Sequence, residues 1–189
     1  MYLIVWLWNP GSEYSSTKHN IWRIAMDLLI EQLSIQPKWI YDKNAKANIL
    51  ISDTSSFDLE GIEEDKIIRA KPQTYMNLSW MSVSWLAKYY KIPNKNILVL
   101  HDDLDLEVGK IKYKPKWSSW WQNGIKDIIN KLGTQEFYRI KIGIWRPANP
   151  AYDIVRYVLS KNTNEELLLL KEQLPIIIRS IELFLQWKC

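Results

Sequence analysis

The sequence holds only two histidines, and one of them lies where it could act as a base. His19 belongs to a polar segment, residues 14–20, that directly precedes a stretch with apolar residues at helical spacing. A neutral imidazole titrates near pH 7 and can take a proton from water, so His19 is a candidate general base. The alternative is an ordinary surface or capping histidine. His101 lies at a strand end beside two carboxylates, which favours a structural hydrogen-bonding role.

Three aspartates, Asp102, Asp103 and Asp105, form an acidic group after the same strand. Together they could bind Mg²⁺ for phosphoryl transfer, although the sequence lacks a Gly-x-x-x-x-Gly-Lys-[Ser/Thr] phosphate loop. One carboxylate could instead orient a histidine and stabilise its protonated form, as in hydrolytic triads. A third interpretation is a solvated turn with helix-capping aspartates. The residues alone leave these interpretations open.

Lysines occupy every second position of a short alternating segment. They are Lys110, Lys112, Lys114 and Lys116. Alternate side chains of a strand share one face, so the four would form a basic ridge. Such a ridge suits the phosphate backbone of a nucleic acid and would make binding depend on salt. Lysines also protect edge strands from aggregation, and the two roles are compatible.

These groups need a framework that brings strand ends together, and the hydropathy pattern predicts one. Apolar or alternating runs predict strands, and apolar residues at helical spacing predict helices. Strands are expected at 3–7, 66–71, 97–100, 110–116 and 138–144, with one or two more within 39–51. Helices are expected at 20–34, 77–90, 123–132, 151–158 and 163–187, and a loop or hairpin at 52–65.

Strands that alternate with helices indicate a single α/β domain, residues 1–189, with a mixed, mostly parallel sheet flanked by helices. The carboxyl ends of parallel strands meet at one edge of the sheet, where α/β folds gather their reactive groups. Asn9 follows the first strand, and Asp102 follows the best central strand. Both are therefore expected at the same rim.

Length and composition predict a folded cytoplasmic protein. The 189 residues are 47% apolar and 24% charged with a net charge of +4, so the chain can bury a sizeable core. The sequence contains no run of about eighteen apolar residues, so we expect no membrane span. Its apolar start lacks the basic leader of a secretion signal. The one cysteine, Cys189, permits neither an internal disulfide nor a cysteine-based metal site.

Several segments together resemble bacterial peptidyl-tRNA hydrolases, from residue 3 to about residue 160. They are 3–11 (LIVWLWNPG), 13–14 with 17–20 (EY, TKHN), 75–79 (YMNLS), 101–106 (HDDLDL), 122–124 (QNG) and 142–147 (IGIWRP). Each segment is weak alone, but their order and spacing are specific. The resemblance implies a monomeric cytoplasmic enzyme that hydrolyses the ester between peptide and tRNA, recycles tRNA, and needs no metal or cofactor.

The resemblance also implies roles for individual residues. His19 corresponds to the family's histidine that activates the attacking water, and Asp102 to the carboxylate that orients this histidine. Asn9 corresponds to the asparagine that distinguishes a peptidyl group from a free aminoacyl group. Four more residues correspond to substrate-holding positions, namely Tyr14, Tyr75, Asn77 and Asn123. The lysine ridge and residues 117–121 are then the candidate tRNA contacts.

Tryptophan is unexpectedly common, with 11 residues against 6 glycines. The family pattern has glycine at eight of these positions, namely Trp6, Trp8, Trp22, Trp80, Trp117, Trp120, Trp121 and Trp145. Glycine serves where φ is positive or where backbones approach closely, and an overpacked site typically costs about 1–3 kcal/mol. Our hypothesis is that the gene uses UGA as a glycine codon that has been read as tryptophan.

Gln122 also differs from the family pattern, and glycine codons do not explain this difference. The family usually has histidine before the Asn-Gly pair. A secondary proton-transfer or tRNA-contact role of that histidine does not carry over directly to this chain. An RNA-binding protein of the same fold without turnover is the alternative function. Retention of His19 and Asp102 together with three asparagines favours the enzyme, because a pure binder needs no water-activating pair.

Overall fold

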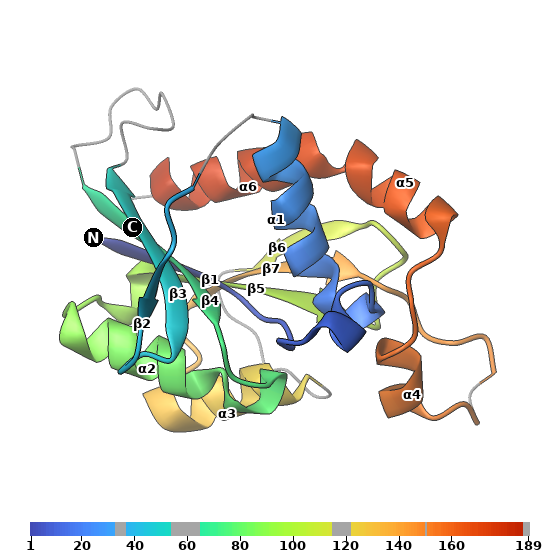
Figure 1. Cartoon of the computed structure of the whole chain (residues 1–189), viewed down its shortest axis with the longest axis horizontal. Helices are drawn as coiled ribbons and strands as arrows, with labels where there is room; N and C mark the ends of the chain where they lie inside the picture. The colour runs from blue at the N-terminus through green and yellow to red at the C-terminus, as the bar shows by residue number, and fades with distance from the viewer. Residues whose placement is uncertain (33–36, 54–64, 115–121, 150, 187–189) are drawn as a thin grey trace.

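The computed structural model describes residues 1–32, 37–53, 65–114, 122–149 and 151–186, which form a mixed sheet covered by helices on both faces (Figure 1). The strands are β1 (Tyr2–Trp6), β2 (Ile40–Asp42), β3 (Ala47–Asp53), β4 (Lys66–Pro72), β5 (Ile97–Asp103), β6 (Ile111–Lys114) and β7 (Tyr138–Gly143). The α-helices are α1 (Ile21–Gln32), α2 (Trp80–Tyr89), α3 (Asn123–Leu132), α4 (Ile154–Val158), α5 (Asn164–Glu172) and α6 (Leu174–Gln186). The 3₁₀ turns are η1 (Ser12–Tyr14), η2 (Lys18–Asn20), η4 (Met76–Leu78) and η5 (Asn94–Asn96).

The sheet has the order β2-β3-β4-β1-β5-β7-β6. Its centre is parallel, because β1 pairs with β4 and β5, and β5 pairs with β7. The outer strands β2, β3 and β6 pair in the antiparallel sense. Every residue of β1 and β5 is buried, as expected for parallel strands covered on both faces. The predicted α/β fold with a mixed sheet flanked by helices is confirmed.

Two apolar cores share this sheet. Ile4 and Trp6 of β1 face the core closed by α1, α5 and α6, whereas Leu3 and Val5 face the core closed by α2 and α3. This division follows from the period of two in a strand, which sends neighbouring side chains to opposite faces. Because both cores depend on the same strands, the described residues form one domain. Among them, no helix combines the length and the hydropathy needed to cross a bilayer.

Three predicted boundaries were wrong. The strand predicted at 97–100 continues to Asp103, so Asp102 lies inside β5 rather than after it. The helix predicted at 163–187 is two helices, α5 and α6. In one continuous helix Pro175 would donate no hydrogen bond, and its ring would clash with the carbonyl of Lys171. The helix predicted at 77–90 begins only at Trp80, after the turn η4.

The other helices and strands predicted within the described residues are present as helices and strands. The region 39–51 holds β2 and β3, and Gly133 caps α3 in the left-handed conformation with φ 69°. Some predictions fall outside the described residues. They concern Lys116, Trp117, Trp120, Trp121, Trp187, Cys189 and most of the loop predicted at 52–65.

Candidate active site

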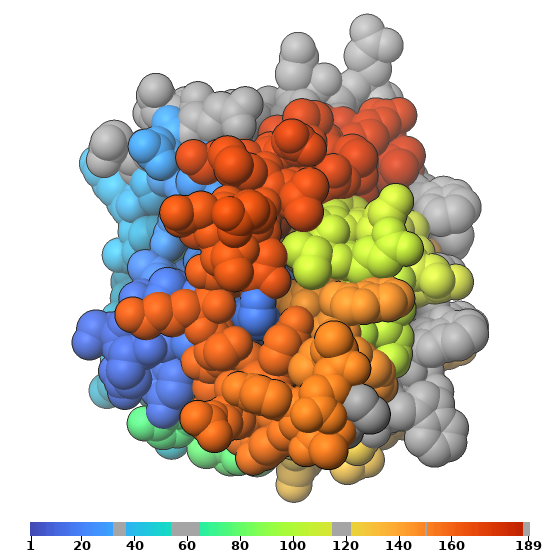
Figure 2. Space-filling view, turned by 90° about the vertical axis from the view of Figure 1, so that its right-hand side faces the viewer, coloured from blue at the N-terminus to red at the C-terminus, as the bar shows by residue number. Residues whose placement is uncertain are grey.

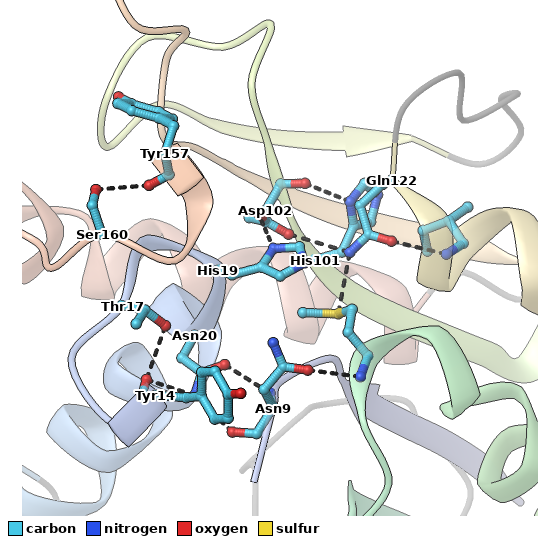
Figure 3. A network of polar contacts seen from close by, with 12 residues as sticks. Asn9, Tyr14, Thr17, His19, Asn20, His101, Asp102, Gln122, Tyr157 and Ser160 are labelled. Atoms are coloured by element: carbon cyan, nitrogen blue, oxygen red, sulfur yellow. Dashed lines mark hydrogen bonds and ion pairs between the residues drawn. The ribbon is translucent and has the colours of Figure 1, made fainter. Parts of the chain in front are cut away.

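His19 and Asp102 form a hydrogen-bonded pair at the rim of the sheet (Figure 3). The Nδ1 atom of His19 lies 2.6 Å from Oδ2 of Asp102. The histidine side chain is 14% exposed and the aspartate side chain is 0% exposed, so water reaches the base but not its partner. Because Nδ1 is bound to the carboxylate, Nε2 is the nitrogen left to take a proton. This is the arrangement of a general base oriented by a buried carboxylate.

Asn9 and Asn20 connect the end of β1 to the turn that carries His19. The backbone amide of Asn9 donates to Oδ1 of Asn20 at 2.7 Å, and the Asn20 amide group donates to the carbonyls of Asn9 and Tyr14, each at 2.9 Å. Asn20 is fully buried. The residue patterns did not single it out, and its only sequence signal is its place beside His19. These three hydrogen bonds fix η2, and hence His19, relative to the sheet.

A second anchor holds the same turn from the other side. Lys18 is buried and forms an ion pair with Glu166 in the first turn of α5. The backbone amide of Lys18 also donates to the carbonyl of Ser160 at 2.9 Å. In Figure 2 the orange segment that contains α4 and α5 lies directly against the blue segment near the N-terminus. Sequence reasoning missed this anchor, since its partners are 148 residues apart.

The residues expected to hold substrate lie around the pair at different distances from it. Asn9 is buried, and its Oδ1 accepts from the backbone amide of Met76 at 2.8 Å. The Tyr14 and Tyr75 rings contact edge to face, with centroids 6.4 Å apart. Figure 3 places Asn9 and Tyr14 on the same side of His19.

Two of the predicted substrate residues form no side-chain hydrogen bond with the described residues of this group. Asn77 in η4 and Asn123, the first residue of α3, are both exposed. Their elements pack closely, because a Cβ atom on Gly124 would lie 2.9 Å from the carbonyl oxygen of Met76. Glycine is therefore required there to bring the two asparagine-bearing elements together.

The three aspartates of the acidic group do not converge. Asp102 binds His19, Asp103 binds Lys141 at 2.7 Å, and Asp105 binds Arg146 at 2.8 Å. Within the described ranges no group of three histidine, cysteine or acidic residues is placed to hold a metal ion. Each carboxylate thus has a different partner, and the contact of Asp102 with His19 fits the histidine-orienting interpretation of this aspartate.

His101 is buried behind the pair and has a structural contact, as predicted. Its Nδ1 atom lies 2.7 Å from the backbone carbonyl of Asp102, which fits a donating N–H. Burial, with a smaller effect of Lys141, lowers the pKa of His101 to about 4. His101 is therefore neutral at pH 7, and the only imidazole of the pair's neighbourhood that solvent reaches is that of His19.

The lysines lie on the other side of β7, at the edge of the sheet. Of the three lysines that the structure describes, Lys112 and Lys114 belong to β6, whereas Lys110 precedes it and lies 3.9 Å from Glu107. In the register of β6 and β7, Lys112 is opposite Lys141, and Lys114 is opposite Arg139. Like charges directly opposite each other are unfavourable unless an anion screens them. We call Lys110, Lys112 and Lys114 the basic edge.

Comparisons with known proteins agree on one family. A family model described as "Peptidyl-tRNA hydrolase" matches residues 3–188. Curated peptidyl-tRNA hydrolases from Desulfitobacterium hafniense and Clostridium botulinum are 39% and 38% identical to this chain, covering 97% and 96% of it and 92% and 88% of their own length. The crystal structure of the peptidyl-tRNA hydrolase from Acinetobacter baumannii is similar with a TM-score of 0.82, at 30% identity, over 98% of this chain and 89% of that chain.

Proposed function

The chain belongs to the peptidyl-tRNA hydrolase family, and we propose that His19 and Asp102 carry out its reaction. The protein is an enzyme that hydrolyses the ester bond between the peptide and the tRNA of peptidyl-tRNA. The observation that carries the assignment of residues is the 2.6 Å contact between His19 and the buried carboxylate of Asp102. A protein that only binds RNA has no use for such a pair.

The proposed reaction begins with a water molecule at Nε2 of His19. The imidazole takes a proton as the water oxygen attacks the ester carbonyl, and Asp102 stabilises the imidazolium through Nδ1. When the tetrahedral intermediate collapses, the bond to the ribose oxygen breaks and that oxygen receives the proton from His19. The products are a peptide with a free carboxyl group and a tRNA with a free hydroxyl group, and His19 is neutral again.

Asn9 is the residue that we assign to selecting a peptidyl group. Its Oδ1 is occupied by the amide of Met76, which leaves the Nδ2 amide group as its free donor. A donor suits the amide carbonyl of a peptidyl group and is unsuited to the ammonium of a free aminoacyl group. Tyr14, Tyr75, Asn77 and Asn123 are the proposed further contacts of the peptide and the tRNA end.

The basic edge is the proposed contact for tRNA phosphates. Lys112 and Lys114 face Lys141 and Arg139 across the strand pair, and burial lowers the pKa of Arg139 to about 10. Of the two facing cations, Lys141 binds Asp103. An RNA phosphate would relieve the repulsion between the paired charges. We further propose that the enzyme acts as a monomer in the cytoplasm and needs no cofactor.

The tryptophans at family glycine positions are, in our proposal, glycines in the natural protein. Trp145 has φ 53°, in the left-handed region that glycine favours. Trp6 and Trp22 are fully buried, and neither indole N–H has a hydrogen-bond partner. Buried indoles usually find an acceptor. Reading the codons tests the proposal, since UGA at these positions supports it and UGG contradicts it.

The test of the catalytic assignment is release of labelled peptide from purified peptidyl-tRNA. We expect release by the parent protein and a loss of about 10²–10⁴-fold in kcat for His19→Ala. Equal rates for the two proteins would contradict the assignment. Binding of tRNA by the parent without release would support the RNA-binding alternative.

A further inference from the structure

One buried side chain, that of Gln122, links the first turn of α3 to the catalytic pair. Its Oε1 accepts from the backbone amide of Ile125 at 2.9 Å and caps the helix. Its Nε2 lies 3.2 Å from Oδ1 of Asp102. Since only the amide oxygen can accept from Ile125, the NH₂ group must be the end that faces the carboxylate. The two oxygens of Asp102 are thus held separately, by Gln122 and by His19.

The choice of glutamine as a helix cap is informative. Asparagine, aspartate, serine and threonine are the preferred N-cap residues, because their short side chains reach the free amides of the first turn. Glutamine is longer by one methylene group and is not among them. At position 122 that extra length lets one amide group cap α3 and reach Asp102 in β5 (Figure 3). A residue chosen for capping alone would not need this length.

We propose that Gln122 is a positioning residue of the reaction, and that its amide holds the Asp102 carboxylate in the orientation that His19 requires. The proposal rests on the assignment of His19 and Asp102 given above. The hydrogen bond comes from an uncharged amide, so it persists at every pH at which the protein is folded. It also ties the catalytic pair to α3, which begins with Asn123.

Among the described charged groups around this contact, His19 is the partner of Asp102 that solvent reaches. His101 is buried and neutral near pH 7, Asp103 is bound to Lys141, and Lys18 points to Glu166 on α5. The acid limb of the pH profile of kcat is therefore expected to be a single-proton step. A substitution of Gln122 that weakens its hydrogen bond to Asp102, or that places a charge there, should shift the acid limb of the pH profile of kcat.

Two substitutions separate the capping role from the positioning role. Gln122→Asn keeps a favoured N-cap but is too short to reach Asp102, so we expect an unchanged Tm and a roughly tenfold lower kcat. KM should remain within about twofold, because the contact acts on the pair and not on substrate binding. Gln122→Glu keeps the accepting oxygen and puts a carboxylate beside Asp102. Two buried carboxylates this close repel each other and share a proton, so the acid limb of the pH profile of kcat should move away from that of the parent.

His19→Ala is assayed beside them, so that failure of the two proposals can be told apart. If His19→Ala is inactive while Gln122→Asn and Gln122→Glu keep the parent kcat and pH profile, Gln122 is only a helix cap and the proposal is overturned. Losses of kcat that merely follow losses of Tm would overturn it as well. If His19→Ala retains the parent rate, the catalytic assignment itself has failed, and the positioning role fails with it.

Discussion

The rim around His19 and the basic edge lie on opposite sides of β7 but are built in opposite ways. At the rim, Asp102 and Gln122 are almost completely buried, and the two oxygens of Asp102 contact His19 and Gln122 at 2.6 and 3.2 Å. At the basic edge, Lys110 and Lys112 are exposed, and Lys110 makes a long contact of 3.9 Å with Glu107. The rim holds a few atoms in fixed positions, whereas the basic edge exposes positive charge.

This difference separates the two tasks of the enzyme. A base that activates one water molecule against one carbonyl gains from a fixed geometry, since misplacement by about 1 Å can cost 10²-fold in rate. A surface that meets a long phosphate backbone gains from adaptable charges, and its binding weakens with salt. Changes at the rim should therefore alter kcat, and changes at the basic edge should alter KM and its dependence on salt.

The largest expected effect comes from Asp102→Asn. The amide keeps the size of the carboxylate but cannot stabilise the imidazolium, so kcat should fall by about 10³-fold with little change in KM. Steady-state release of peptide measures both constants. A fall in kcat of less than about threefold would show that the rim does not depend on this charge.

The second expected effect is on the pH dependence of stability, and it comes from His101, which is buried behind the catalytic pair. Because His101 has a pKa of about 4 when folded and an ordinary value of 6.5, the unfolded chain binds more protons between these values. Stability should therefore be full above pH 6.5 and fall by about 3 kcal/mol as the pH drops to 4. Denaturant unfolding at several pH values measures the loss. In His101→Asn the free energy of unfolding should fall less steeply between pH 6.5 and pH 4. An identical slope in the variant and the parent would show that His101 does not cause the loss.

The third effect concerns the basic edge. Replacing Lys112 and Lys114 by glutamine should raise KM about tenfold at physiological salt and reduce the slope of log KM against log salt by about two. Replacing Lys66 and Lys91, two exposed lysines outside the basic edge, by glutamine is the control with the same charge change. The comparison fails if the control changes KM as much as the double variant does.

The smallest effect lies between the two regions, at Trp145. Its backbone amide donates to the carbonyl of Leu106 at 2.9 Å while its φ is 53°. A left-handed conformation costs a non-glycine residue about 1–2 kcal/mol, so Trp145→Gly should raise the free energy of unfolding by about 1 kcal/mol. Denaturant titration checks it. A decrease would argue that tryptophan is the native residue there.

Much of this arrangement was predictable from local patterns. The apolar runs predicted β1 and β5, and the rule that strand ends meet at one rim predicted that Asn9 and Asp102 would be near each other. The pairing of His19 with Asp102 came from the resemblance to a family, and the structure places the two side chains 2.6 Å apart.

Other contacts could not be predicted because they depend on tertiary geometry. The burial of Asn20 and the Lys18–Glu166 ion pair arise only when distant segments pack together. The second contact of Gln122 depends on the distance between α3 and β5, which no pattern within either element encodes.

The most direct test of the division between chemistry and binding is one single-turnover experiment on three proteins. Cleavage of labelled peptidyl-tRNA is followed at increasing enzyme concentration for the parent, for His19→Ala, and for the variant with glutamine at Lys112 and Lys114. We predict that His19→Ala lowers the rate at saturation by at least about 10²-fold with the half-saturating concentration unchanged. The lysine variant should keep the saturated rate and need about tenfold more enzyme. A saturated rate that falls with the lysines, or that survives the loss of His19, would contradict the division.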